Sequence, residues 1–138
     1  LPPVTVSGAL TLLDEHGITL DGLRGVVVAE DSAYSRMIGE AFRRRGVSMS
    51  APMPAGSSWI AEAEIVIVAL GNPGAVSSLT LQHGCVALDF GYYNEGARGD
   101  IDTEPGVSHL RALMPVPGGV GPMTVSALIE RVVAFAEG

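Results

Sequence analysis

The turn after the first long hydrophobic run carries two carboxylates, in the segment Ala29, Glu30 and Asp31. In a dinucleotide-binding fold this turn holds a pyrophosphate, which needs glycines for close backbone approach and amides at the start of a helix. The segment has no Gly-x-Gly-x-x-Gly pattern, and its charge has the wrong sign for an anion. A helix cap at Asp31 or Ser32 therefore explains these residues better than a phosphate site does.

Another carboxylate that could do chemistry is Asp89, near the end of the apolar run of residues 85–90. Gly91 and Tyr92 follow it directly. An acid at the end of a buried strand can orient a ligand, or it can bond only to nearby backbone amides. The residues leave both alternatives open.

A rigid loop is predicted between Pro115 and Thr124, where the sequence reads PVPGGVGPMT. Its three prolines restrict the backbone, and its three glycines leave the backbone bare. Such a loop can lie against a planar ligand, ahead of the helix that we expect to begin at Pro122. A ligand-binding role is favoured over a structural one.

Several kinds of chemistry are excluded or disfavoured by composition. All eight basic residues are arginine, so this chain has no lysine amine to act as an acid, a base or a Schiff-base former. Cys85 is the only cysteine, and His83 and His109 lack partners at metal-ligand spacing, so we expect no metal site. A net charge of −7 disfavours nucleic-acid binding. No apolar run is long enough to span a membrane and no signal peptide opens the chain, so we expect a cytoplasmic protein.

The elements that position these residues alternate between helices and strands. Helices are predicted over residues 5–16, from Ser32 to the arginines at 43–45, and from Pro122, with a helical turn at 57–63 that Trp59 anchors to the sheet. Strands are predicted over residues 25–29, 47–51, 65–70 and 85–90. With 138 residues, the chain forms a single domain. The expected fold is α/β, a doubly wound Rossmann-like three-layer α-β-α sandwich with a mostly parallel sheet.

The loop at residues 115–124 resembles the signature of the bifunctional methylenetetrahydrofolate dehydrogenase/cyclohydrolases. Other segments are similar to motifs of that family along the whole chain: Pro3, Thr5 and Gly8, the segment of residues 63–73, the strand end with Asp89, Gly91 and Asn94, and the turn at residues 99–102. The resemblance implies that this chain is the family's C-terminal NAD(P)-binding domain. It also implies a role in one-carbon folate metabolism, with NADP as cofactor and a homodimer as the assembly.

The resemblance also implies roles for single residues. Pro117, Gly118, Gly119, Val120 and Gly121 would line the surface that faces the folate one-carbon derivative, while Tyr92 and Thr124 would lie near the nicotinamide. The family's catalytic Tyr and Lys belong to an N-terminal folate domain. This chain begins with Leu1 where that domain ends, so the folate domain is expected on a separate or cleaved piece. By itself the chain is expected to be inactive.

All departures from the family pattern lie on the phosphate side of the cofactor site. The family's Gly-Arg-Ser after the first strand is Ala29, Glu30 and Asp31 here, and its Cys-His-Ser after the second strand is replaced by residues 52–54. We therefore expect NADP and NAD to bind weakly or not at all, unless Arg36, about one helical turn further on, reaches back and compensates. The alternatives to a dehydrogenase domain are a folate-using relative without redox chemistry and a non-catalytic binding or dimerisation module.

Overall fold

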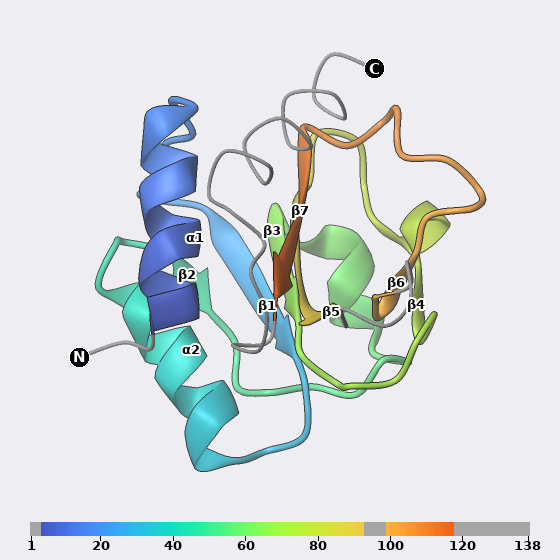
Figure 1. Ribbon diagram of the computed structural model, residues 1–138, viewed down its shortest axis with the longest axis horizontal. Helices are drawn as coiled ribbons and strands as arrows, with labels where there is room; N and C mark the ends of the chain where they lie inside the picture. The colour runs from blue at the N-terminus through green and yellow to red at the C-terminus, as the bar shows by residue number, and fades with distance from the viewer. Residues whose placement is uncertain (1–3, 93–98, 118–138) are drawn as a thin grey trace.

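The centre of the molecule is a five-stranded sheet in which every strand runs parallel to its neighbours (Figure 1). The computed structural model describes residues 4–92 and 99–117. The strand order is β2-β1-β3-β5-β7, with bounds Ser48–Met49, Arg24–Val28, Ile65–Val68, Val86–Tyr92 and Ala112–Pro117. This confirms the predicted α/β Rossmann-like class with a mostly parallel sheet.

The middle strands are apolar throughout because both of their faces are covered. In β3, Ile65 and Ile67 face one hydrophobic cluster, while Val66 and Val68 face the other. A strand buried on both faces needs a continuous apolar run instead of an alternating one. The predicted strands at 25–29, 47–51, 65–70 and 85–90 are all present, although their ends differ from the predicted ones.

Among the described elements, two α-helices cover one face of the sheet (Figure 1). Helix α1 is Val4–Glu15 and helix α2 is Ala33–Arg43, close to the predicted bounds. Leu12 and Leu13 of α1, and Ile38 and Phe42 of α2, are fully buried against the strands. The helix predicted from Pro122 lies outside the described residues.

The opposite face of the sheet is covered by shorter elements (Figure 1). They are the 3-10 helices η1 (Ser58–Glu62) and η2 (Ser78–Thr80) and a small parallel sheet of β4 (Val76–Ser77) and β6 (Ile101–Asp102). Helix η1 corresponds to the predicted helical turn, with Ser57 as its cap. The small sheet and η2 were not predicted, because segments of two or three residues are too short to show a periodic pattern.

The predicted role of Trp59 is wrong, because its side chain is 60% exposed. Ile60 and Ala63 hold this segment on the sheet instead, each being 2% exposed. A 3-10 helix has three residues per turn, so one side chain in three faces inward. Here Ile60 and Ala63 take the inward positions, and Trp59 faces outward.

The loop predicted at residues 115–124 is wrong for its first three residues, and residues 118–124 lie outside the described part of the chain. Pro115 and Pro117 belong to strand β7, where they pair with Asp89 and Tyr92 of β5. Within the described part of the chain β7 is one of the two outer strands of the sheet, the other being β2. Proline is tolerated there because an outer strand does not need all of its N–H groups for pairing.

Candidate functional site

The carboxyl ends of the five parallel strands lie along one edge of the sheet (Figure 1). From β1 the chain moves to β2 on one side and then crosses to β3 on the other side, so the strand order reverses between β1 and β3. In open parallel sheets, ligands bind outside the carboxyl ends at such a reversal. Two turns flank it: residues 29–32, here called the β1 turn, and residues 70–72, here called the β3 turn.

The β1 turn is held by bonds within its own neighbourhood. The buried Ala29 donates its N–H to the carbonyl of Met53 at 3.0 Å, which ties the turn to the segment after β2. The carbonyl of Glu30 accepts the Ser35 hydroxyl at 2.8 Å, and the Glu30 side chain is exposed. The turn therefore presents a carboxylate to solvent where a phosphate site would need positive charge.

The start of helix α2 is closed by a reciprocal cap. The Ser32 hydroxyl accepts from the N–H of Ser35 at 3.1 Å, and the Ser35 hydroxyl accepts from the N–H of Ser32 at 3.0 Å. The predicted cap is thus confirmed at Ser32 and not at Asp31. Each of these two amides already has a side-chain partner, whereas a phosphate site at a helix start relies on amides that a ligand can reach.

Asp31 forms a two-pronged ion pair with Arg36. The distance from Nε to Oδ1 is 2.6 Å, and the distance from Nη2 to Oδ2 is 2.7 Å. The hydrogen bonds from Arg36 lower the pKa of the Asp31 carboxyl, and both side chains are exposed. Arg36 does reach back to the turn, as the sequence allowed, but its guanidinium is engaged by Asp31. The negative charge of Asp31 is compensated, and that of Glu30 has no ion-pair partner among the described residues.

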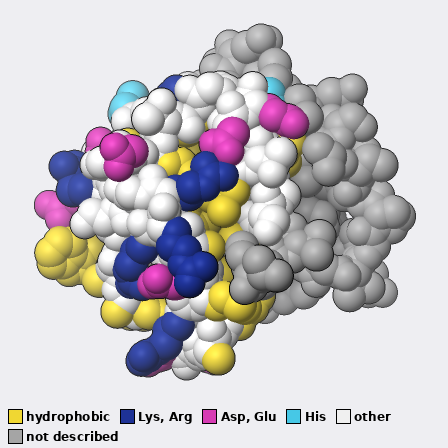
Figure 2. All heavy atoms as spheres, turned by 90° about the vertical axis from the view of Figure 1, so that its left-hand side faces the viewer, with side chains coloured by type: hydrophobic (Ala, Val, Ile, Leu, Met, Phe, Trp, Pro, Cys, Tyr) yellow, Lys and Arg dark blue, Asp and Glu magenta, His cyan; other side chains and the backbone are white. Residues whose placement is uncertain are grey.

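The arginines at the end of α2 are also paired with acids. Arg43 and Arg44 lie 3.6 and 3.7 Å from Glu40, and Arg45 lies 2.8 Å from Asp14. Basic and acidic side chains accordingly lie next to each other on the face that carries α1 and α2 (Figure 2). This arrangement supports helix-end compensation and surface pairing over an anion site.

Asp89 bonds to backbone amides, which decides between the two alternatives that the sequence left open. Its Oδ1 accepts from the N–H groups of Gly91 at 3.0 Å and Asp100 at 3.1 Å, and its Oδ2 accepts from Ile101 at 3.0 Å. The residue is only 5% exposed. Burial raises the pKa of the Asp89 carboxyl, although the amide bonds from Ile101 and Asp100 oppose that rise.

Asp100 repeats this arrangement at the β3 turn. Its Oδ2 accepts from the N–H groups of Leu70 at 2.7 Å and Gly71 at 3.0 Å, and its Oδ1 accepts from Asn72 at 2.7 Å. The side chain of Asp100 is fully buried. In the sequence, Asp100 stands out only as part of a segment similar to a family motif. A lone aspartate gives no local signal that its side chain will bond to a turn nearly thirty residues away.

Two glycines make room for these carboxylates. A Cβ atom on Gly91 would overlap the Asp100 carboxylate, and a Cβ atom on Gly99 would overlap that of Asp89. Neither glycine has a positive φ, so close approach explains their presence better than backbone conformation does. The glycines and the aspartates therefore form one packed unit.

Tyr92 and Pro117 end neighbouring strands and are paired in the sheet register. The structure thus brings together the backbones of one residue expected near the nicotinamide and one expected on the folate-facing surface. Gly118, Gly119, Val120, Gly121 and Thr124 lie outside the described residues. The expected roles of all these residues stay predictions.

The cysteine and the loop histidines show no catalytic arrangement in the described part of the chain. Burial raises the pKa of the Cys85 thiol to about 12, so the reactive thiolate is scarce at neutral pH. The rings of His83 and His109 lie 5.4 Å apart, and His109 Nε2 lies 2.9 Å from the Ser78 carbonyl. Among the residues that the structure describes, no three His, Cys, Asp or Glu side chains are grouped to hold a metal ion. None of the described helices is long and apolar enough to cross a membrane.

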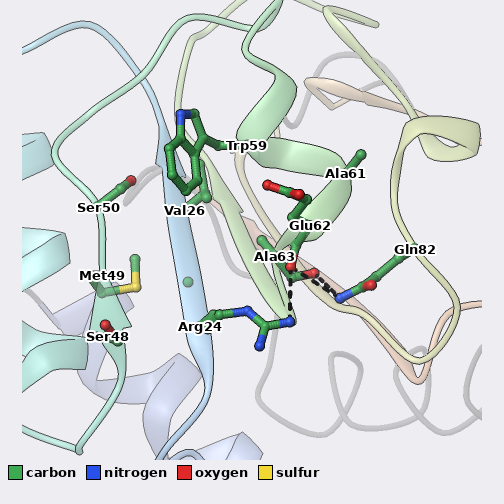
Figure 3. A pocket seen from close by; sticks show the side chains of 11 residues that line it. Arg24, Val26, Ser48, Met49, Ser50, Trp59, Ala61, Glu62, Ala63 and Gln82 are labelled. Atoms are coloured by element: carbon green, nitrogen blue, oxygen red, sulfur yellow. Dashed lines mark hydrogen bonds between the residues drawn. The ribbon is translucent and has the colours of Figure 1, made fainter.

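A separate cavity of about 510 Å³ lies beside the start of β1, away from the carboxyl edge (Figure 3). Trp59 and Met49 contribute apolar walls, and Arg24 and Gln82 contribute polar ones. Arg24 and Gln82 donate to backbone carbonyls at the end of η1, with Gln82 Nε2 2.8 Å from the Ala63 carbonyl. Their donors are thus partly used within the protein.

A family model described as tetrahydrofolate dehydrogenase/cyclohydrolase, NAD(P)-binding domain, matches residues 3–138. Among curated proteins, the bifunctional protein FolD 1 of Streptomyces avermitilis is 31% identical, over 96% of this chain and 47% of its own length. The bifunctional protein FolD of Shouchella clausii is 30% identical, over 99% of this chain and 50% of its own length. The chain therefore spans about half the length of the curated relatives it matches.

Solved structures show the same similarity. The methylenetetrahydrofolate dehydrogenase/cyclohydrolase FolD of Campylobacter jejuni superposes with a TM-score of 0.73 at 28% identity, over 99% of this chain and 51% of that one. The enzyme of Trypanosoma brucei, solved with NADP and an inhibitor, has a TM-score of 0.70 at 22% identity, over the same shares. At that lower identity the second likeness concerns the fold alone.

Proposed function

The chain belongs to the tetrahydrofolate dehydrogenase/cyclohydrolase family as its NAD(P)-binding domain, and we propose that it serves one-carbon folate metabolism as part of such a protein. The observation that carries the proposal is the match over residues 3–138, which includes the segment of residues 115–124. The chain has no lysine. The family's catalytic lysine would therefore come from an N-terminal folate domain, attached or separate, and the chain alone would convert no folate.

We further propose that this domain binds NADP and NAD weakly or not at all. At the β1 turn, the amides of Ser32 and Ser35 are bonded within the cap, and Arg36 is engaged by Asp31. The Glu30 carboxylate is exposed at the same turn, where it would repel a pyrophosphate or a 2′-phosphate. The residues present do not fit the phosphate half of a dinucleotide.

The half of the site at β5 and β7 supports a ligand role more strongly. Tyr92 and Pro117 pair at the ends of these strands, and the sequence of residues 115–124 resembles the family signature. We propose that residues 117–121 contact a folate one-carbon derivative, with Thr124 nearby. Replacing Gly119 or Gly121 by Val, in a protein that carries the folate domain, would weaken folate binding. Unchanged binding by a folded variant would contradict this role.

A second candidate function follows from the closed β1 turn. A relative that kept the folate contacts and lost redox chemistry would transfer or hydrolyse the one-carbon unit, and would need no dinucleotide. A non-catalytic dimerisation module is the remaining alternative, because a homodimer is implied by the family resemblance. Methylenetetrahydrofolate oxidation by the full-length protein with added NADP separates the dehydrogenase from the other two candidates.

Calorimetric titration of the 138-residue chain with NADP and NAD tests the cofactor proposal directly. We expect no micromolar binding by the unmodified chain. The double change Glu30→Arg and Asp31→Ser restores a basic residue and releases Arg36, so we expect NADP affinity to rise at least about tenfold.

The double change Asp14→Ser and Glu15→Arg is the matched control. It alters the net charge equally and also releases an arginine, Arg45, but it lies at the far end of α1. This control should leave NADP affinity unchanged. Micromolar binding by the unmodified chain would contradict the proposal, and an equal gain in the control would show that net charge alone is responsible.

A further inference from the structure

Two buried carboxylates connect β5, the start of β6 and the end of β3 in series. Asp89 on β5 accepts from the amides of Asp100, which precedes β6, and of Ile101, the first residue of β6. Asp100 in turn accepts from three consecutive amides of the β3 turn, at 2.7, 3.0 and 2.7 Å. A displacement of Asp89 would therefore reach the β3 turn through Asp100.

Neither carboxylate is placed to touch a ligand. Asp89 is 5% exposed and Asp100 is fully buried, and together they accept six backbone hydrogen bonds. Any effect that they have on binding must act through the backbone that they hold.

The β3 turn depends on Asp100 for its conformation. All three of its amides bond to that one side chain, and Gly71 adopts a φ of +69° that the bonds help to maintain. After the turn, Gly74 donates to the carbonyl of Gly99, the residue before Asp100, at 3.0 Å. The turn thus rests on the segment of residues 99–101 and flanks the reversal point of the sheet.

We propose that Asp100 is a positioning residue for the β3 turn, and that Asp89 positions Asp100, so that one wall of the ligand site is set from strand β5. The coupling between Asp89 and the β3 turn is inferred from the hydrogen bonds of Asp89 and Asp100 and does not depend on any ligand. Its effect on a ligand rests on the proposed function, namely that the carboxyl edge of the sheet binds a nucleotide or a folate.

Amide hydrogen exchange, followed residue by residue by NMR, tests the coupling without any ligand. In Asp100→Asn we expect protection of the amides at 70–72 to fall at least tenfold relative to the core amide of Val66. In Asp89→Asn we expect the same loss at 70–72, although Asp89 does not touch that turn. Retained protection at 70–72 in Asp89→Asn would overturn the proposal.

Two control variants separate positioning from general loss of stability. Asp102→Asn removes the charge of a carboxylate two residues after Asp100, which among the described residues accepts the nearby amide of Glu104 at 3.1 Å and no amide of the β3 turn. Val66→Ala weakens the core under the sheet without touching either carboxylate. Protection at 70–72 should stay level with the core amides in both. A selective loss in either control would also overturn the proposal.

The unmodified chain provides a second measurement if the variants fail to fold. In a pH titration, the amides of Gly91 and Ile101 report directly on Asp89. Under the proposal the amides at 70–72 also shift as the pH passes through the midpoint that Gly91 and Ile101 report, because Asp100 moves with Asp89. The absence of any shift at that midpoint would contradict the coupling.

The ligand effect is measured in the Glu30→Arg and Asp31→Ser background with NADP as the probe. Adding Asp100→Asn should lower NADP affinity at least tenfold, whereas adding Asp102→Asn should not. If the background binds no NADP, the proposed cofactor site is wrong, and the exchange data still decide the coupling. If NADP binds equally with and without Asp100→Asn, the positioning role is wrong.

Discussion

Aspartates stand at the carboxyl edge of the sheet in two contrasting settings. At the β1 turn, Asp31 is exposed and pairs with a neighbouring arginine of the same helix. Asp89, within β5, and Asp100, just before β6, are buried and bond to backbone amides from other segments. The same residue type thus serves a local surface pair in one region and long-range backbone support in the other.

The contrast shows where this fold can change without losing its structure. The surface pair costs little to replace, because exposed ion pairs contribute little to folding. The buried carboxylates are costly to replace singly, because a lost carboxylate oxygen leaves amides without partners. The departures from the family pattern accordingly lie at the β1 turn and at residues 52–54, whereas the segments around Asp89 and Asp100 resemble the family motifs.

The largest expected effect is on the glycines that pack against the buried carboxylates. Gly91→Ala and Gly99→Ala each place a methyl group where a carboxylate lies, so the unfolding free energy should fall by about 2–4 kcal/mol. Urea denaturation measures the loss. Gly56→Ala is the matched control, because a Cβ atom there meets open space. A loss below about 1 kcal/mol would show that the carboxylates can shift freely.

A smaller effect is expected at the cap of α2. Ser32→Ala removes the acceptor for the Ser35 amide and should lower the unfolding free energy by about 1 kcal/mol. Ser48→Ala, at an exposed position in β2, should change it by less than about 0.5 kcal/mol. Equal losses in the two variants would mean that the cap is not formed in solution.

The carboxyl pKa values in the two regions should be shifted in opposite directions by folding. The pKa of Asp89 is raised, so its contribution to stability is fully present below the ordinary value of 3.8 and is lost as the pH rises through its folded-state value. The pKa of Asp31 is lowered, so its contribution is present above 3.8 and is lost as the pH falls. Carboxyl ¹³C shifts followed against pH measure both. A lowered pKa at Asp89 would contradict the prediction, because it would mean that the amide bonds outweigh the effect of burial.

The smallest effect is expected at the surface pair. Asp31→Ser should leave the melting temperature unchanged within error, because Asp31 and Arg36 are both exposed. Differential scanning calorimetry measures the melting temperature, and low salt is used because salt screens exposed ion pairs. A clear fall in melting temperature would show that the Asp31–Arg36 pair stabilises the folded protein.

Much of the framework was predictable from the sequence because its signals are local. Ser32 as the cap of α2, the doubly buried strand at Ile65–Val68 and the burial of Cys85 all follow from residue type and spacing. Strand β7 was missed, because two prolines within six residues resemble a loop unless the edge position is known. Trp59 was misplaced for a similar reason: its size suggested burial, and only the three-residue repeat of η1 turned it outward.

By itself, the sequence determined the α/β class, the order of the main elements and the acidic character of the β1 turn, because each depends on neighbours within a few positions. The tertiary structure alone decided what the carboxylates do. The sequence allowed the Arg36 side chain to reach back to the β1 turn, but only the folded structure shows that it pairs there with Asp31. Apart from the local amide of Gly91, Asp89 bonds to amides 11 and 12 positions away, and Asp100 bonds to amides 28 to 30 positions away. No local propensity encodes these longer-range bonds, since they form only when the folded chain brings β5, the start of β6 and the end of β3 together.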